Sequence, residues 1–367
     1  MGVEASPRNG DVAPASAPHP LILGLQPVAL IDHVVRVDWS LLDQVPGDRG
    51  GSIPVAIEEL QHILGEVKTH MLASPDDTSP MRTIAGGSVA NTIRGLSANF
   101  GVSCGIIGAY GDDEEGKLFV SNMGFNGVNL SRLRRKKGPT GQCVCLVDAL
   151  GNRTMRPCLS NAVKVQADEL TKEDFKGSKW VVMRYGIFNI EVIQAAIKIA
   201  KQEGVCVSLD LASFEMIRNF RSPLLQLLES GEIDLCFANE DEAMELLRDE
   251  QNADPEAALE FLAKYCKWAV VTLGPNGCIA KHGKETVRVP AVGEAKATDA
   301  TGAGDLFASG FLYGLVKGLS LEECCKLGAC SGGAVVQSLG GEVTPENRQW
   351  MYKQMQMKGL PNPDVRN

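Results

Sequence analysis

The sequence contains Asp299-Ala300-Thr301-Gly302-Ala303-Gly304-Asp305, a glycine-rich turn that runs directly into the apolar segment 306–312. Small residues leave the backbone N–H groups of such a turn accessible, and the first N–H groups of a helix have no intrahelical partners. The positive end of the helix dipole acts in the same direction. The stretch therefore predicts a cradle for an anion, with the backbone of Gly302, Ala303 and Gly304 at its centre.

Asp305 places a carboxylate at the edge of this cradle, where it would repel a bound anion. Two interpretations are open. Asp305 is either the N-cap of a buried helix, a common role for aspartate, or a general base that takes a proton from a hydroxyl group attacking the anion. An anion site beside a general base suits phosphoryl transfer to an alcohol. Asp299, Thr301 and the motifs elsewhere in the chain favour the general base.

Composition and charge restrict the class of protein. The chain has 367 residues, with 36 Lys and Arg against 45 Asp and Glu, and its net charge of −9 argues against non-specific binding to nucleic acid or to anionic membranes. No apolar run reaches the roughly 18 residues of a transmembrane helix. The 11 cysteines include no C-x-x-C pair, and their odd number indicates reduced thiols in an intracellular, cytoplasmic protein.

From residue 21 onward, short apolar runs alternate with amphipathic segments, which is the pattern of an α/β protein. The runs typical of strands are 21–25, 34–37, 103–108, 180–183, 205–209, 234–237 and 268–273. The segments typical of helices are 55–71, 88–100, 189–202, 240–247 and 255–266. This alternation predicts a mostly parallel central sheet that is covered by helices on both faces.

Two regions, 34–52 and 128–157, interrupt the alternation with short strand-like pieces and glycine turns. We interpret them as a small β lid over the main sheet. Antiparallel hairpins are predicted in its second part, at 131–140, 143–147 and 153–156. The basic run 132–137 is predicted to lie at the solvated edge of this lid, although contact with an anionic substrate is an alternative.

The expected domain plan has three parts. A single domain spans 20–350 and includes both lid segments. It follows a disordered N-terminal tail, 1–19, which is rich in Pro, Ala, Ser and Gly and has almost no large apolar residues. The segment 351–367 is expected to be a C-terminal tail.

A second glycine motif, 85–91, joins a predicted strand to a predicted helix. The absence of side chains at Gly86 and Gly87 would let a ligand approach the backbone closely. Asn91, one turn into the helix, offers a donor and an acceptor to a hydroxylated ligand. An ordinary strand-to-helix turn with an exposed Asn is the alternative.

Two further motifs follow strands in the second half of the chain. Asn239 to Glu242 is an acidic helix start, which is common in helices of every function, or a site at which Glu242 holds hydrated magnesium. Thr272 to Gly277 is a hairpin turn, or a nucleotide contact at the carboxyl end of a strand. A third motif, 111–117, matches G-x-x-x-x-G-K but carries four carboxylates and lacks the following Ser or Thr, so we reject a P-loop there.

Taken in order, these motifs resemble the PfkB or ribokinase-like family of carbohydrate and nucleoside kinases. The resemblance covers about 21–345, and Asp-x-Thr-Gly-Ala-Gly-Asp is its most specific element. It implies a three-layer α/β/α fold with a β lid, ATP as the phosphoryl donor, and Mg²⁺.

By position, the resemblance implies a role for each motif. Asp305 would be the catalytic base, and Gly302, Ala303 and Gly304 would form the anion hole. The ATP contacts would be Asn239, Thr272, Gly274 and Gly277, with Glu242 holding Mg²⁺ through water. The contacts to the acceptor would be Asp32, Gly86, Gly87 and Asn91. Asp299 and Thr301 fall where many members hold a monovalent cation such as K⁺.

The segment 24–42, which contains Asp32, resembles the opening of adenosine-kinase-type members. We therefore expect transfer to the ribose 5′-OH of a nucleoside of the adenosine, inosine or guanosine type. A ribokinase- or fructokinase-type sugar kinase is the alternative, and a non-catalytic interaction protein on the same fold is a further one. The lid would close over the acceptor, and its edge offers a surface for a homodimer.

Overall fold

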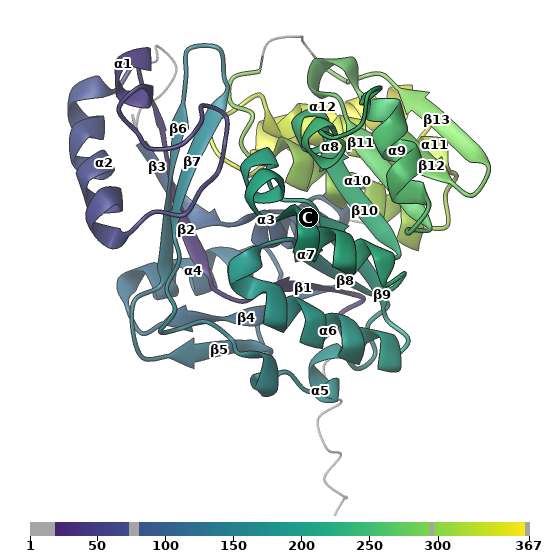
Figure 1. Cartoon of the computed structure of the whole chain (residues 1–367), viewed down its shortest axis with the longest axis horizontal. Coiled ribbons are helices and arrows are strands. Elements are labelled where there is room, and N and C mark those ends of the chain that lie inside the picture. The colour runs from purple at the N-terminus through teal and green to yellow at the C-terminus, as the bar shows by residue number, and fades with distance from the viewer. Residues whose placement is uncertain (1–18, 73–80, 294–296, 364–367) are drawn as a thin grey trace, which may run out of the picture.

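The computed structural model describes residues 19–72, 81–293 and 297–363. The predicted N-terminal tail therefore lies, apart from its last residue, outside the described residues. The described chain forms two sheets and the helices that cover them (Figure 1). None of the helices in this described part combines the length and the hydrophobicity that a membrane span needs.

The main sheet has nine strands, and most of them are parallel. They are β1 (Ile22–Gln26), β4 (Cys104–Gly111), β5 (Leu133–Lys136), β8 (Trp180–Arg184), β9 (Cys206–Asp210), β10 (Leu235–Asn239), β11 (Trp268–Thr272), β12 (Cys278–His282) and β13 (Glu285–Val289). Their order is β13-β12-β11-β10-β9-β8-β1-β4-β5, and every neighbouring pair is parallel except β11–β12 and β12–β13. Strand β1 lies between β4 and β8, so the later strands of the chain are added on both sides of it. Open α/β sheets bind ligands at the carboxyl ends of the strands at such a change of direction.

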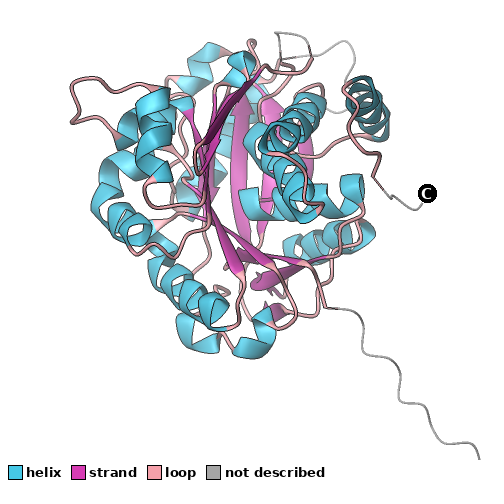
Figure 2. Ribbon diagram, turned by 90° about the vertical axis from the view of Figure 1, so that its right-hand side faces the viewer, coloured by secondary structure: helices cyan, strands magenta, loops and turns pink. Residues whose placement is uncertain are grey.

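Helices cover both faces of this sheet, which confirms the predicted three-layer fold (Figure 2). One layer contains α3 (Ser88–Phe100), α4 (Glu114–Phe125), α10 (Ala303–Val316), α11 (Leu321–Val335) and α12 (Pro345–Met357). The other contains α6 (Ile190–Gln202), α7 (Phe214–Glu229), α8 (Glu240–Leu246) and α9 (Pro255–Ala263). Along β10, Leu235 and Phe237 pack into the first layer, and Cys236 and Ala238 into the second. Strands buried on both faces are therefore apolar throughout.

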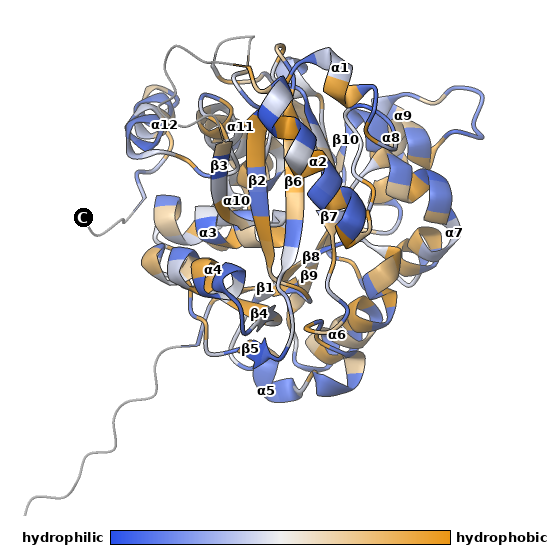
Figure 3. Ribbon diagram, turned by 90° about the vertical axis from the view of Figure 1, so that its left-hand side faces the viewer, coloured by the Kyte–Doolittle hydropathy of each residue, from blue (hydrophilic) through white to orange (hydrophobic). Residues whose placement is uncertain are grey.

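A second, smaller sheet forms the lid. Its strands, in spatial order, are β3 (Met81–Gly86), β2 (Leu30–Arg36), β6 (Gly141–Val147) and β7 (Arg153–Cys158). The short α1 (Trp39–Leu42) and the amphipathic α2 (Ile57–His70) pack on one face (Figure 3). Leu60, Ile63 and Val67 recur at helical spacing along α2 and are buried against the lid strands. The other face turns toward Leu339 in the main body.

The predicted hairpin at 131–140 is wrong, because β5 pairs with β4 in parallel at the edge of the main sheet. The basic run 132–137 therefore lies at the edge of the main sheet, and two of its residues form ion pairs. Arg134 bonds Asp174 beside the short α5 (Lys172–Phe175), and Lys136 bonds Glu169. The lid instead takes β3, the strand expected before the Gly86-Gly87 turn, which lies outside both predicted lid regions.

The predicted C-terminal boundary at 351 is also wrong. Helix α12 continues to Met357, and Met351 and Met355 are fully buried against the main core. Leu360, beyond the helix, is buried as well. The helix is mostly polar, so its apolar contacts are too few to stand out in the sequence.

Candidate active site

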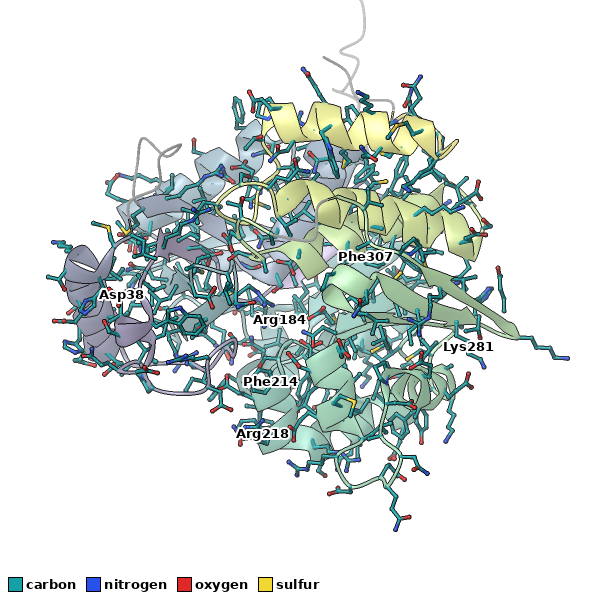
Figure 4. The ribbon with its side chains drawn as sticks, turned by 90° about the horizontal axis from the view of Figure 1, so that it is seen from above. Asp38, Arg184, Phe214, Arg218, Lys281 and Phe307 are labelled. Atoms are coloured by element: carbon teal, nitrogen blue, oxygen red, sulfur yellow. The ribbon has the colours of Figure 1, made fainter. Side chains whose placement is uncertain are left out.

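Two adjoining pockets open at the carboxyl ends of the central strands, below the lid. The lid pocket reaches from Gln26 and Asp32 to Tyr185 and holds about 880 Å³ of space, part of it open to solvent. The turn pocket is lined by the glycine turn and by Asp305. The two pockets share the residues Ser88, Met155, Arg184 and Ala212. Arg184 lies between the lid and the main body in Figure 4.

The glycine turn forms the start of α10. Gly302 is the N-cap, with φ of 76°, and a Cβ there would lie 2.8 Å from Gly341 Cα, so only glycine fits this position well. Gly302 and Gly304 line the turn pocket. The Ala303 N–H instead donates to Ala300 O at 3.2 Å. The amides of the two glycines are therefore available to a ligand in the pocket, whereas the Ala303 amide is already engaged.

Asp305 occupies the third position of α10, and its carboxylate does not cap the helix. Its Oδ2 accepts a hydrogen bond from Asn91 Nδ2 at 2.9 Å. Burial raises the pKa of Asp305 to about 6, although the hydrogen bond from Asn91 acts in the opposite direction. A carboxylate with this pKa is ionised at neutral pH and is a stronger base than an ordinary Asp.

The orientation of Asn91 is set by Arg94, which is 2% exposed. Arg94 Nη2 donates to Asn91 Oδ1 at 2.8 Å, which leaves the amide nitrogen of Asn91 to face Asp305. Arg94 is held in turn by Ala85 O and Gly341 O. The sequence motif identified Asn91, but nothing local to Arg94 marks it as the residue behind the base.

Asp32 lies in the lid pocket and is 1% exposed. Neither of its carboxylate oxygens has a partner at normal hydrogen-bond geometry among the described residues, although the nearby backbone N–H of Gly87 acts to lower its pKa. Burial raises the pKa of Asp32 to about 7, while the positive charge of Arg94 acts to lower it. A buried carboxylate without partners in a pocket is suited to accept hydrogen bonds from the hydroxyl groups of a ligand.

The Gly86-Gly87 segment lies directly against Asp32. A Cβ at Gly86 would lie 2.0 Å from Asp32 Cγ, so a side chain there would displace the carboxylate. Gln26 fixes the segment, because its Nε2 donates to Gly86 O at 3.1 Å and its Oε1 accepts from Ala90 N at 2.9 Å. The strand β1 thereby ties the lid to α3.

Asn239 and Glu242 form a capping box at the start of α8, so the structural interpretation of this motif is correct. Glu242 also lines the turn pocket, together with Asp210 at the end of β9. Burial and the negative charge of Asp210 raise the pKa of Glu242 to about 8. Two neighbouring carboxylates that disfavour each other's ionisation are suited to a hard divalent cation with oxygen ligands, such as Mg²⁺.

Thr272, at the end of β11, lines the turn pocket, and its hydroxyl donates to Ala238 O at 3.4 Å. Gly274 and Gly277 bound the 3₁₀ turn η3 (Gly274–Asn276), which lies outside the lining of both pockets. Of the three predicted nucleotide contacts on this turn, only Thr272 therefore reaches the turn pocket.

Asp299 and Thr301 are both buried. The Asp299 carboxylate accepts from the backbone N–H of Thr301 and of Gly340, each at 2.7 Å. Thr301 lines the turn pocket, and its hydroxyl has no hydrogen-bond partner among the described residues. Asp299 ties two loops together, and a monovalent cation at this position stays a prediction.

The rejected P-loop motif has a structural role. Asp113 caps α4, accepting from the Gly116 N–H at 2.9 Å and from the Thr140 N–H at 2.7 Å. The segment lies outside both pockets of the candidate site.

Sequence reasoning missed three charged residues that line the turn pocket, which are Arg153 on β7, Arg184 at the end of β8, and Asp210. Arg184 Nη2 donates to Ala212 O, and its Nε is buried without a partner among the described residues. Arg184 and Asp210 each end a buried strand, and polar residues at carboxyl strand ends are a signal that could have identified both.

The pocket with a buried carboxylate, two bare glycine amides and a helix start has the chemistry of a phosphoryl-transfer site. The family model described as pfkB family carbohydrate kinase matches residues 63–347, more than half of the chain. The chain belongs to the pfkB family of carbohydrate kinases. It is an ATP-dependent phosphotransferase.

Relatives of this pfkB kinase differ in the acceptor that their names give. A ribokinase from Lactococcus lactis is 28% identical over 261 residues, which are 71% of this chain and 81% of the relative. The crystal structure of an adenosine kinase from Sinorhizobium meliloti has a TM-score of 0.81 at 28% identity and covers 91% of this chain and 99% of its own. A probable sugar kinase protein from Rhizobium etli has a TM-score of 0.82 at 28% identity and covers 94% and 100%. These relatives are all named as kinases, but their names give different acceptors.

Proposed function

We propose that this pfkB kinase transfers the γ-phosphoryl group of ATP to the ribose 5′-OH of a nucleoside. One observation carries the choice of acceptor. Asp32, with both oxygens unpartnered, lies in a pocket that is otherwise mostly apolar. A nucleoside matches this combination of one carboxylate and apolar walls. Its ribose carries hydroxyl groups, and the two faces of its flat base make no hydrogen bonds.

The apolar part of the lid pocket supports a nucleoside over a free sugar. It is formed by side chains such as Val28, Met155, Leu159, Tyr185, Phe188 and Met216. Phe188 is 51% exposed, so an aromatic face is available to a ligand. Aromatic side chains stack on flat rings, and a free pentose or hexose would leave these surfaces without a matching partner.

In the proposed reaction, Asp305 accepts the proton of the attacking hydroxyl while the amides of Gly302 and Gly304 stabilise the transferring phosphoryl group. Asp210 and Glu242 would hold hydrated Mg²⁺, which neutralises charge on the phosphates when it is bound. Asn239 and Thr272 would contact ATP from the neighbouring strand ends.

A panel of acceptors tests the proposal. Adenosine, inosine and guanosine are compared with ribose and fructose at fixed ATP and Mg²⁺, with kcat/KM measured for each. We expect at least one nucleoside to exceed both sugars by roughly 100-fold or more, because burying the base adds several kcal/mol of binding. A free sugar that exceeds every nucleoside would show that the acceptor is a sugar.

The pH dependence should separate the two carboxylates. Asp305 acts ionised, so kcat is expected to fall about tenfold per pH unit below about 6, where the base becomes protonated. Asp32 has a pKa of about 7 in the free protein, so kcat/KM for the acceptor should begin to fall at a higher pH than kcat. Identical profiles for the two parameters would contradict separate roles for Asp305 and Asp32.

Gly86→Ala should weaken acceptor binding selectively. The new Cβ would lie 2.0 Å from Asp32 Cγ and must push the carboxylate out of place. We expect the KM for the acceptor to rise by roughly 10- to 100-fold, equivalent to the loss of one or two charge-assisted hydrogen bonds. The KM for ATP should change little, and Gly65→Ala is the matched control because a Cβ there meets no neighbouring atom. An unchanged acceptor KM would remove Asp32 from the acceptor site.

We also propose that two copies pair through the lid. The edge strands of its sheet are β3 and β7; the segment 51–55 already hydrogen-bonds to β7, so the exposed start of β3 is the edge that a second chain could extend. Size-exclusion chromatography with light scattering tests this, and a monomer at assay concentration would contradict it.

A further inference from the structure

Two cysteines lie beside Asp32 on the inner face of the lid. Cys143 and Cys145 are two residues apart on β6, so their side chains project from the same face of the strand. In the parallel register of β2 and β6, Asp32 is paired with Cys143. The two Sγ atoms are 3.8 Å apart, and both lie within 4.8 Å of a carboxylate oxygen of Asp32.

This spacing matches the donor geometry of a soft divalent cation. With Zn–S bonds of about 2.3 Å, tetrahedral zinc separates two bound sulfurs by about 3.8 Å. The third donor is also prepared, because the Asp32 oxygens are buried and have no partner among the described residues. A carboxylate and two thiolates are ligands that zinc accepts, and the fourth position would face the lid pocket, which Cys143 lines.

We propose that Asp32, Cys143 and Cys145 form an inhibitory site for a thiophilic divalent cation, with Zn²⁺ as the natural probe. Binding Zn²⁺ replaces the two thiol protons, which leave to solvent, and forms two Zn–S bonds and one Zn–O bond. The complex carries one net negative charge, since three anionic ligands meet a divalent ion. The positive charges of Arg94 and Arg184 act on Asp32 and offset that charge.

The consequence for catalysis rests on the proposed role of Asp32 as the acceptor-binding carboxylate. A metal on Asp32 removes the oxygens that the acceptor hydroxyls need. Metal and acceptor should therefore exclude each other, whereas ATP, which binds through the turn pocket, should not protect the enzyme. Inhibition is expected to be competitive with the acceptor.

Direct binding is measured first, with Co²⁺ alone added to the full-length protein under reducing conditions. Co²⁺ takes the place of Zn²⁺, and its bonds to thiolates give a charge-transfer absorption. We expect this absorption in the wild type, its loss in both Cys145→Ala and Cys145→Ser, and its retention in Cys158→Ser. Cys158 is the matched control, because it lies on the neighbouring strand β7 but packs with α2 on the other face of the lid.

Inhibition is then measured at free Zn²⁺ concentrations set by a metal buffer. Loss of the Cys145 ligand should raise the inhibition constant by at least 10- to 100-fold, a change that even outer-shell partners of a metal can cause. The Cys158→Ser variant should behave as the wild type. Absence of a thiolate–cobalt absorption in the wild type, or its persistence in both Cys145 variants, would overturn the site. A Cys145-dependent absorption without competition by the acceptor would support the metal site and refute the role of Asp32 in acceptor binding.

Discussion

Asp305→Asn is expected to lower kcat by roughly 10²–10⁴, the range that a positioned general base contributes. The substitution preserves the shape of the side chain, and its Oδ1 can still accept the hydrogen bond that Asn91 Nδ2 makes at 2.9 Å. The negative charge is lost and, with it, the ability to take a proton. Steady-state kinetics at saturating ATP and acceptor measures the effect.

Two controls accompany Asp305→Asn. The Kd for ATP should stay within a few-fold of the wild-type value, and the fall of kcat near pH 6 should disappear, because that fall reports the Asp305 carboxyl. The variant should also unfold at an equal or higher temperature. The pKa of Asp305 is raised from 3.8 to about 6 in the folded protein, so its ionised form opposes folding at neutral pH. Near-normal turnover with intact ATP binding would exclude Asp305 as the base.

The residues that sequence reasoning found are those marked by local chemistry. Glycines before a helix can be recognised from the sequence alone, so Gly302 and Gly304 predict an anion cradle. Asn91 is recognised in the same way, because it follows a glycine pair at a helix start. That Asn91 touches Asp305 depends on α3 packing against α10, which no local pattern shows. The family resemblance predicted that Asn91 and Asp305 belong to one active site.

Residues without a local signature were missed. Arg94 lies on the buried side of α3, where a charged residue contradicts the apolar pattern. Its role is apparent only from the four groups to which it donates hydrogen bonds.

Ala303 is the reverse case, a residue that the motif marks as a contact although its amide is already engaged. Its position in the motif implied an anion contact, but its N–H closes a turn with Ala300. A motif specifies which residues are present and leaves open which N–H groups remain unpaired.

The errors in the fold have similar physical causes. Strand β5 is short and basic, so its sequence resembles a surface hairpin, yet pairing with β4 satisfies its backbone and carboxylates neutralise Arg134 and Lys136. Local patterns cannot choose between a neighbour in sequence and a distant sheet edge, since both satisfy the same backbone groups.

Arg153→Ala should cause the second large loss of activity. Arg153 is the first residue of β7 in the lid and lines the turn pocket together with Gly302 and Gly304. Its positive charge acts on Asp305 and Glu242, lowering the pKa of each. A fixed cation at this position would stabilise the charge that develops on the transferring phosphoryl group, and we expect kcat to fall by roughly 10²–10³ when it is removed.

The loss should carry a signature that misfolding does not produce. Removing a positive neighbour raises the pKa of Asp305, so the fall of kcat at low pH should move to higher pH in Arg153→Ala. Arg153→Lys should recover part of kcat, because it restores the charge without the planar fork. Arg135→Ala is the matched control, since Arg135 is an exposed arginine on β5, outside both pockets. Equal losses of kcat in Arg153→Ala and Arg135→Ala would mean that overall charge, and not a cation delivered by the lid, supports the transfer.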